Sequence, residues 1–242
     1  WWCLHREVCY YMRGQIVYIK GHAESEQQAQ QALNSFKKNK WEVELVEGVT
    51  PKTVKDTDEY KNYKIIDKSR LHDFKKQNYN RFLTKVSCAI NHIRFWEKVV
   101  NENETLAFLE HDSISVMDFS NLQFNDYLIL NAEYVFKPPS KLNLNQFRNY
   151  EWSGFGINKL PESYPLKYYR DNIWKDSSMV PGTGSYAITP KGAAKMLDAI
   201  ERCGLDQSDY MLNSFNVDIQ YILPSPVKFN TVNLSTSYGV SL

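Results

Sequence analysis

The chain has 242 residues, which suits one large domain or two small ones and allows a substantial core without disulfides or metals. Its net charge of +1 excludes a global electrostatic attraction to nucleic acid or to an anionic membrane surface. No apolar run approaches the length of a membrane span, and the N-terminus lacks the apolar core of a secretory signal. The four cysteines are scattered without a CxxC pair, so we expect reduced thiols in a cytoplasmic protein and no zinc site.

Strands and a helix alternate near the start of the chain. Residues 15–19 are β-branched and aromatic, which is typical of a short buried strand. Apolar residues then share one helical face over 23–38, and residues 41–46 alternate with the period of two that a strand has. This order predicts the opening of a βαβ unit with a parallel sheet. We expect residues 1–14 to be an N-terminal extension and residues 15–242 to form a single domain.

The middle of the chain predicts one long connection, one helix and two buried strands. Residues 50–82 are polar without a strong period, so they form a connection with one helical piece. Apolar residues recur at helical spacing over 86–100. Residues 106–109 and 127–130 are short apolar runs bounded by turns or acids, as central strands are. The first of these two strands leads directly into an acidic triplet.

The last hundred or so residues predict loops, two strands and two helices. Residues 137–180 are rich in proline and aromatics, which favours loops at the rim of a site. A turn at 181–185 precedes a short strand at 186–188, and residues 219–223 close the sheet. The alternation of strands and helices predicts an α/β fold with a largely parallel sheet, in which ligands bind at the carboxyl ends of strands.

Capping residues mark the two helices in this part of the chain. Thr189 stands before Pro190, a favoured start, and Gly204 follows the apolar face of the helix as a stop signal. Asp206, with Asp209 three residues later, predicts the cap of a second helix. A carboxylate at such a position is more often a cap than a catalytic group.

The acidic triplet is the sharpest chemical feature. Glu110 and Asp112 leave a central strand two residues apart, so both carboxylates can point to the same side. A hard divalent cation often takes only one or two carboxylates and completes its shell with water and substrate phosphates. Such an ion would stabilise a departing nucleoside diphosphate. A polar turn after a strand is the alternative interpretation of the triplet.

Three further segments carry residues of chemical interest, and each has a structural alternative. Residues 87–92 (Ser-Cys-Ala-Ile-Asn-His) place His92 on a helix, where a histidine is more often part of the core or the surface. Residues 181–186 contain Gly182 and Gly184, which let a backbone approach a ligand closely or form a tight turn. Asp209 is either a functional carboxylate or a helix cap.

The order of these segments resembles glycosyltransferase family 25, which contains bacterial lipopolysaccharide galactosyltransferases and collagen galactosyltransferases. The resemblance extends over about residues 15–230. The matching segments are residues 87–92 with Trp96, the triplet 110–112, the Gly-Thr-x-x-Tyr turn of Gly182, Thr183 and Tyr186 followed by Gly192-Ala193, the pair Asp209-Tyr210, and the strand before Pro224 and Pro226.

The resemblance implies a GT-A-like nucleotide-sugar-binding fold and an inverting, metal-dependent transfer of a hexose such as galactose from a UDP-sugar to a saccharide or glycoconjugate hydroxyl. It implies Mn²⁺ or Mg²⁺ as cofactor, held by Asp112 and Glu110. Inversion requires a base that deprotonates the acceptor, and the family position of that group is Asp209. The donor and acceptor pocket would be lined by His92, His111, Gly182, Thr183, Gly184 and Tyr186.

The chain departs from the family pattern at several positions, and among these Ser87 replaces the usual glycine and Asn91 the usual serine. His111 replaces the middle acid of the triplet, which removes one negative charge and introduces a nitrogen that can compete as a ligand. The arginine that family members carry after the opening strand is absent, and Lys20 and His22 are the nearest cations. These departures keep a non-catalytic saccharide- or protein-binding member of the fold as the alternative.

A third class, a nucleotidyl- or phosphoryl-transfer enzyme, lacks the glycine-rich phosphate loop after the first strand. We expect no nucleic-acid partner and no transmembrane segment. Association with the inner membrane surface through a lipid-linked acceptor would leave no trace in the sequence.

Overall fold

The computed structural model describes residues 11–64, 79–119, 122–134, 151–168, 172–180, 182 and 184–230. The strands in this part of the chain are β1 Arg13–Tyr18, β2 Glu42–Glu47, β3 Leu106–Glu110, β4 Ser113–Ser115, β5 Tyr127–Ile129, β6 Gly156–Lys159, β7 Ser185–Ile188, β8 Ile219–Leu223 and β9 Val227–Phe229. The helices are α1 Ala23–Lys38, α2 Asp58–Asn62, α3 Tyr79–Glu102, α5 Pro190–Cys203 and α6 Ser208–Met211, with 3₁₀ turns at Val54–Asp56 and Ala132–Tyr134.

Among the described residues, seven strands form one central sheet in the order β2-β1-β3-β7-β5-β8-β6. β1 pairs parallel with β2 and β3, and β5 pairs parallel with β8, whereas β7 and β6 run antiparallel to their neighbours. Five of these seven strands therefore point the same way, which confirms the prediction of an α/β fold with a mostly parallel sheet. β4 and β9 form a small separate antiparallel sheet.

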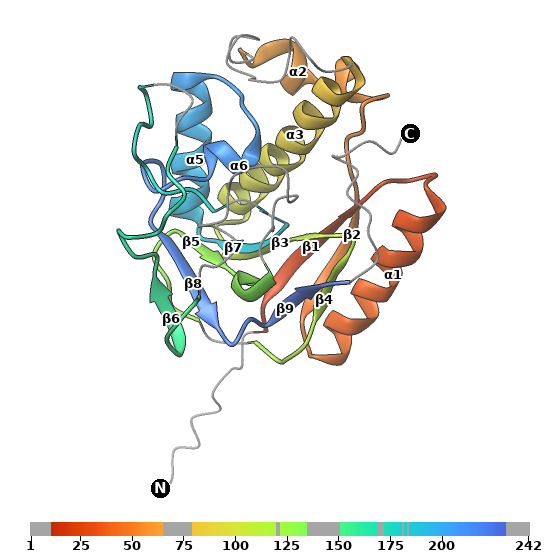
Figure 1. The fold of residues 1–242 in the computed structure, drawn as a ribbon. Coiled ribbons are helices and arrows are strands. Elements are labelled where there is room, and N and C mark those ends of the chain that lie inside the picture. The colour runs from red at the N-terminus through yellow and green to blue at the C-terminus, as the bar shows by residue number, and fades with distance from the viewer. Residues whose placement is uncertain are drawn as a thin grey trace, which may run out of the picture.

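Helices cover both faces of the central sheet (Figure 1). α1 lies on one face together with the β4–β9 sheet, and α3, α5 and α6 lie on the other. The sheet separates two apolar cores, because alternate residues of each strand point to opposite faces. In β3, for example, Leu106 and Phe108 join the core under α3, and Ala107 and Leu109 join the core under α1.

The local sequence signals for the main helices are confirmed. α1 has the bounds that its apolar face predicted, and His22 caps it by accepting a hydrogen bond from the Ser25 amide. Thr189 caps α5 in the same way through the Gly192 amide, and Gly204 ends that helix with φ of 89°. Within the described part of the chain, no helix is both long and apolar enough to cross a membrane.

One strand boundary differs from its prediction, and one predicted cap is wrong. β1 begins at Arg13, two residues before the predicted start, and Met12 is buried in the core. Asp206 does not cap α6, because the N-cap residue is Gln207 and its side chain makes no capping bond. Asp206 instead accepts a hydrogen bond from the adjacent Gln207 amide at 2.7 Å, and this local contact takes the place of a cap.

The predicted loop over 137–180 also contains a strand, β6, in the part that the structure describes. β6 is an edge strand of four residues that pairs with β8. Its sequence carries no clear alternation, since three of its residues are half-buried and one is exposed.

Candidate active site

The predicted acidic segment lies at the carboxyl edge of the central sheet. β1, β3, β5 and β8 all end at this edge, and the antiparallel β7 begins there. β3 ends at Glu110, whose amide donates to the Gly184 carbonyl at 2.7 Å just before β7. Gly184 and the acidic triplet therefore meet at the edge where ligands bind in sheets of this kind.

Three carboxylates gather at this edge. Burial, together with the negative charges of Asp112 and Asp209, raises the pKa of Glu110 to about 8. Burial also raises the pKa of Asp112 to about 6. The three residues come from β3, from the turn after β3 and from α6, so the fold brings together groups that are almost a hundred residues apart. A site that concentrates negative charge in this way favours a bound cation.

Neighbouring groups confirm that the carboxylates share one environment. The pKa of the Cys88 thiol on α3 is raised to about 12, first by burial and then by the charges of Glu110 and Asp209. The thiol is therefore protonated and Cys88 is free, as is Cys203, which agrees with the prediction of reduced thiols. Cys3 and Cys9 lie outside the described residues.

Glycines allow the backbone to pass close to these carboxylates. The Gly182 amide donates to Oδ1 of Asp209 at 3.2 Å, which fixes the Asp209 side chain toward the turn. A Cβ added at Gly184 would lie 2.8 Å from Oε2 of Glu110 and 3.0 Å from Phe229. Glycine is therefore the residue that this close approach requires. Thr183, predicted to line the pocket, lies outside the described residues.

His92 and Tyr186, two other residues predicted for the pocket, lie in the buried core. His92 is 2% exposed and stacks on Phe108 with ring centroids 4.1 Å apart. Its Nδ1 is 2.8 Å from the Tyr186 hydroxyl, which also accepts a hydrogen bond from the Trp96 indole at 3.0 Å. Burial lowers the pKa of His92 to about 3, so the ring is neutral. These two residues support the floor of the site and do not line an open surface.

Tyr186→Phe is expected to lower the free energy of unfolding by about 2 kcal/mol, because it leaves the buried polar atoms of His92 and Trp96 without their partner. Urea denaturation measures this loss. Tyr221→Phe is the matched control, since its hydroxyl makes one bond, to the Ser153 carbonyl, and we expect a smaller loss of about 1 kcal/mol. Equal losses in the two variants would contradict the role of Tyr186 as a central acceptor.

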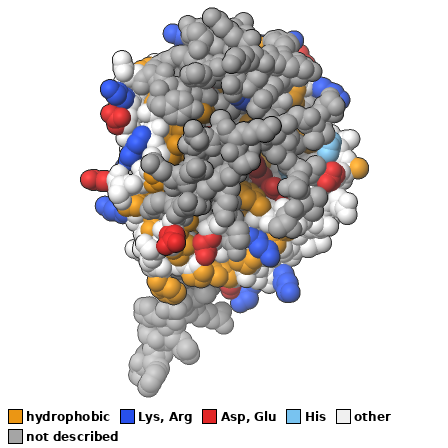
Figure 2. Space-filling view, viewed as in Figure 1, with side chains coloured by type: hydrophobic (Ala, Val, Ile, Leu, Met, Phe, Trp, Pro, Cys, Tyr) orange, Lys and Arg blue, Asp and Glu red, His pale blue; other side chains and the backbone are white. Residues whose placement is uncertain are grey.

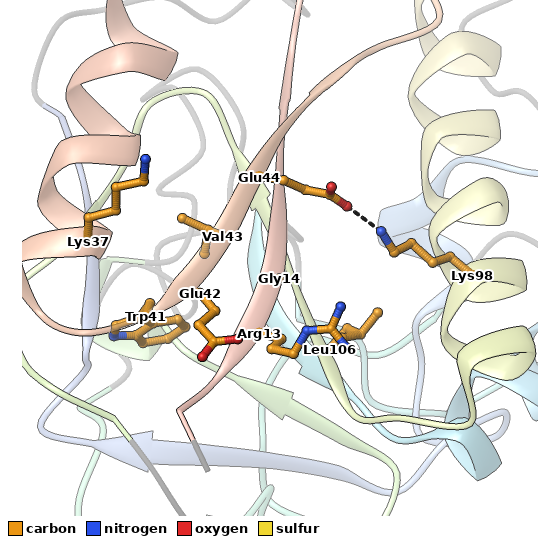
Figure 3. A pocket seen from close by; sticks show the side chains of 9 residues that line it. All are labelled: Arg13, Gly14, Lys37, Trp41, Glu42, Val43, Glu44, Lys98 and Leu106. Atoms are coloured by element: carbon orange, nitrogen blue, oxygen red, sulfur yellow. Dashed lines mark hydrogen bonds and ion pairs between the residues drawn. The ribbon is translucent and has the colours of Figure 1, made fainter. Parts of the chain in front are cut away.

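A separate pocket lies away from the carboxylates. A pocket of about 390 Å³ opens at the amino ends of β1, β2 and β3, at the edge opposite to Glu110. Figure 3 shows Glu44 and Lys98 pointing toward each other there, and Arg13 pairs with Glu102 and Glu104. These charges are already paired and the edge is the wrong one for an α/β ligand site, so we do not assign this pocket to the reaction.

Comparison with known families settles the class of protein. The model of glycosyltransferase family 25, described as LPS biosynthesis protein, matches residues 17–212. The chain belongs to glycosyltransferase family 25. No curated protein sequence matches the chain. The match contains the acidic triplet and Asp209, so this family 25 member is a glycosyltransferase whose partners are a sugar donor and a saccharide acceptor.

Two departures from the family pattern have structural explanations. Asn91, where family members carry serine, donates to the Val49 carbonyl at 3.2 Å and accepts from the Val49 amide at 2.7 Å. It thereby fixes the segment that follows β2. Ser87, where they carry glycine, donates to the Leu83 carbonyl one turn earlier in α3. Both residues serve the scaffold of the glycosyltransferase, which the sequence pattern alone does not reveal.

The cations nearest to the missing arginine have other partners. Lys20 pairs with Glu47 at 3.0 Å, and His22 caps α1. Burial lowers the pKa of His111 to about 4, and the nearby His22 contributes to this shift. Nε2 of His111 is buried without a hydrogen-bond partner. His111 is therefore neutral at pH 7, and its ring nitrogen is available as an acceptor or a ligand.

The carboxylates fit a divalent cation that is shared with a substrate. Oδ1 of Asp112 is buried without a hydrogen-bond partner, and burial, together with the charges of Asp112 and Asp209, raises the pKa of Glu110. Over the ranges that the structure describes, no three His, Cys, Asp or Glu side chains are arranged to hold an ion by themselves. Mn²⁺ or Mg²⁺ with one or two protein carboxylates and several phosphate or water oxygens matches this donor set.

The pKa of Glu110 predicts how the stability of the metal-free protein depends on pH. The folded pKa is raised from 4.5 to about 8, so folding binds a proton and stability falls as pH rises toward 8. The depressed pKa values of His92 and His111 act in the opposite sense below 6.5, where stability falls as pH falls. Below pH 6.5 the raised pKa of Asp112 offsets part of the histidine effect, so the thermal midpoint measured in EDTA is expected to peak between about pH 6 and 6.5, with the steeper fall on the alkaline side.

Glu110→Gln isolates the contribution of the carboxyl group in this experiment. In this variant the thermal midpoint is expected to fall much less between about pH 6.5 and 8, and still to fall on the acid side. Glu133→Gln changes an acid outside the carboxylate cluster, and its thermal midpoint should depend on pH as that of the wild type does. An alkaline-side fall of the same size in Glu110→Gln would contradict the assignment.

Proposed function

We propose that the protein transfers a hexose from a UDP-sugar to a hydroxyl group of a saccharide or glycoconjugate, with Mn²⁺ or Mg²⁺ and with inversion at the anomeric carbon. The observation that carries the proposal is the cluster of Glu110, Asp112 and Asp209 at the carboxyl edge of the sheet. Three carboxylates in one desolvated site are costly for stability, which favours a role in ligand binding over a role in folding.

Glu110 and Asp112 are the residues that would hold the cation. The unpartnered Oδ1 of Asp112 would offer an oxygen ligand, and Glu110 would contact the ion, its water or the ribose. When bound, the ion supplies Lewis-acid stabilisation of the negative charge that develops on the departing diphosphate. His111 has no charge with which to add to this site, since its pKa is lowered to about 4.

Asp209 would act as the general base. The Gly182 amide holds one of its oxygens, so the carboxylate has a fixed orientation at the end of the turn. In the reaction, the acceptor oxygen forms a bond to the anomeric carbon while the bond from that carbon to the diphosphate oxygen breaks. The acceptor proton passes to Asp209, and attack from the face opposite to the leaving group inverts the centre.

The test is the release of UDP from UDP-galactose and UDP-glucose, with a saccharide acceptor mixture, in the presence of Mn²⁺, Mg²⁺ or EDTA. The proposal predicts UDP release from at least one donor that EDTA abolishes. If neither donor is consumed and calorimetry detects no UDP binding with Mn²⁺ present, the catalytic proposal fails. The non-catalytic saccharide- or protein-binding role would then be favoured.

A further inference from the structure

Asn131 carries a buried amide group without any hydrogen-bond partner. The residue is fully buried, and neither its Oδ1 nor its Nδ2 has a partner. A buried unsatisfied amide costs free energy, and the few that native proteins retain call for an explanation. Nothing in the packing of Asn131 supplies one, and the sequence shows only an asparagine after an apolar run.

The register of the sheet places Asn131 in the same row as the acidic site. Ile129 of β5 pairs with Tyr186 of β7, and the Leu130 amide donates to the Ser185 carbonyl at 3.1 Å. Continuing this pairing by one residue on each strand, from Leu130 and Ser185, places Asn131 opposite Gly184. On the other side of Gly184, β3 contributes Glu110, whose amide bonds the Gly184 carbonyl. β3, β7 and β5 lie side by side in this order (Figure 1).

Glu110 and Asn131 belong to the same face of the sheet. Phe108 of β3 and Ile129 of β5 both pack in the core under α3, and each residue lies two positions before the residue in question. The alternation of side chains therefore directs both polar groups to the α3 face. Between them stands Gly184, whose lack of a side chain leaves room for the Glu110 carboxylate and the Phe229 ring to lie against it.

We propose that Asn131 binds a hydroxyl group of the sugar that is transferred, in the row of the sheet that also contains Glu110; this inference rests on the function proposed above. An amide presents a donor and an acceptor, and a sugar hydroxyl both donates and accepts, so one such group can satisfy both unpartnered atoms. A phosphate only accepts, and the neighbouring carboxylates repel it unless a cation intervenes.

The transferred sugar, the ribose and the uracil ring are the parts of a UDP-sugar that offer both a hydrogen-bond donor and an acceptor. The sugar is favoured because the anomeric carbon reacts where Glu110, Asp112 and Asp209 converge, and Asn131 stands in the same row of the sheet. Side chains of both charges are visible at the edge of the molecule in this view (Figure 2).

The test compares wild type with Asn131→Leu, which has similar size without the amide, and with Asn131→Ala. Calorimetry with Mn²⁺ measures the affinities for UDP-galactose, UDP-glucose and UDP. Both variants are expected to bind the preferred UDP-hexose about tenfold more weakly and UDP with unchanged affinity. Without ligand, Asn131→Leu is expected to raise the thermal midpoint, because it removes a buried unsatisfied group.

Three outcomes would overturn the inference. An unchanged ratio of UDP-hexose to UDP affinity in both variants would mean that Asn131 does not contact the sugar. An equal loss for UDP and UDP-hexose would move the contact to the nucleotide. If wild type binds UDP but neither UDP-hexose better than UDP, no sugar contact of this kind exists. Failure of wild type to bind UDP at all would instead overturn the proposed function itself.

Discussion

Asp112→Asn is expected to lower the metal-dependent release of UDP at least a hundredfold. Asparagine keeps the shape of the side chain but removes the negative charge, and its amide nitrogen cannot bind a cation. Because Oδ1 of Asp112 is buried and makes no hydrogen bond in the structure, the substitution breaks no protein contact of that atom. Steady-state kinetics at several Mn²⁺ concentrations measure the loss and show whether excess metal recovers activity.

Asp118→Asn is the matched control for this experiment. Asp118 is an exposed acid that pairs with Lys40 at 3.3 Å, outside the carboxylate cluster. We expect its activity within about twofold of wild type, because exposed pairs contribute little to stability. Full metal-dependent activity in Asp112→Asn would place the cation elsewhere.

Asp209→Asn is expected to lower turnover by a factor of about a hundred to ten thousand while the affinity for the UDP-sugar changes little. The reason is that a general base acts on the acceptor, and its loss does not remove a donor contact. The Gly182 amide can still donate to the asparagine oxygen, so the turn should stay in place. Single-turnover kinetics and donor calorimetry separate the two effects.

Asp198→Asn serves as the control for Asp209→Asn, since Asp198 is an exposed acid of α5 that pairs with Arg202 at 2.7 Å. Its turnover should match that of wild type. If Asp209→Asn turned over as fast as wild type, and its turnover rose with pH in the same way, another group would have to accept the proton. The anomeric configuration of the product, read by NMR, tests inversion independently.

Local signals in the sequence predicted the elements that local interactions define. The bounds of α1 followed from its apolar face, and the start and stop of α5 followed from Thr189 and Gly204. β4 and β9 were not predicted, because each has three residues and exists only by pairing across more than a hundred positions. The strand β6 has the same dependence on a distant partner.

The site residues show the same difference between local signals and long-range contacts. Glu110 and Asp112 could be predicted from their place after a buried strand, which is a local feature. The burial of His92 could not, since it depends on stacking with Phe108 and on the hydroxyl of Tyr186, which is 94 positions away. Asn131 was missed for the same reason, because only the register of β5 with β7 brings it level with Gly184.

The central claim is that the carboxylates at the edge of β3 form a cation site which is completed by a nucleoside diphosphate. The most direct measurement is the binding of Mn²⁺, followed by electron paramagnetic resonance, with and without UDP. We predict weak binding of Mn²⁺ alone, a strong gain in affinity when UDP is present, and loss of that gain in Asp112→Asn. If the affinity for Mn²⁺ did not change when UDP is added, or did not change in Asp112→Asn, the proposed cation site would be wrong.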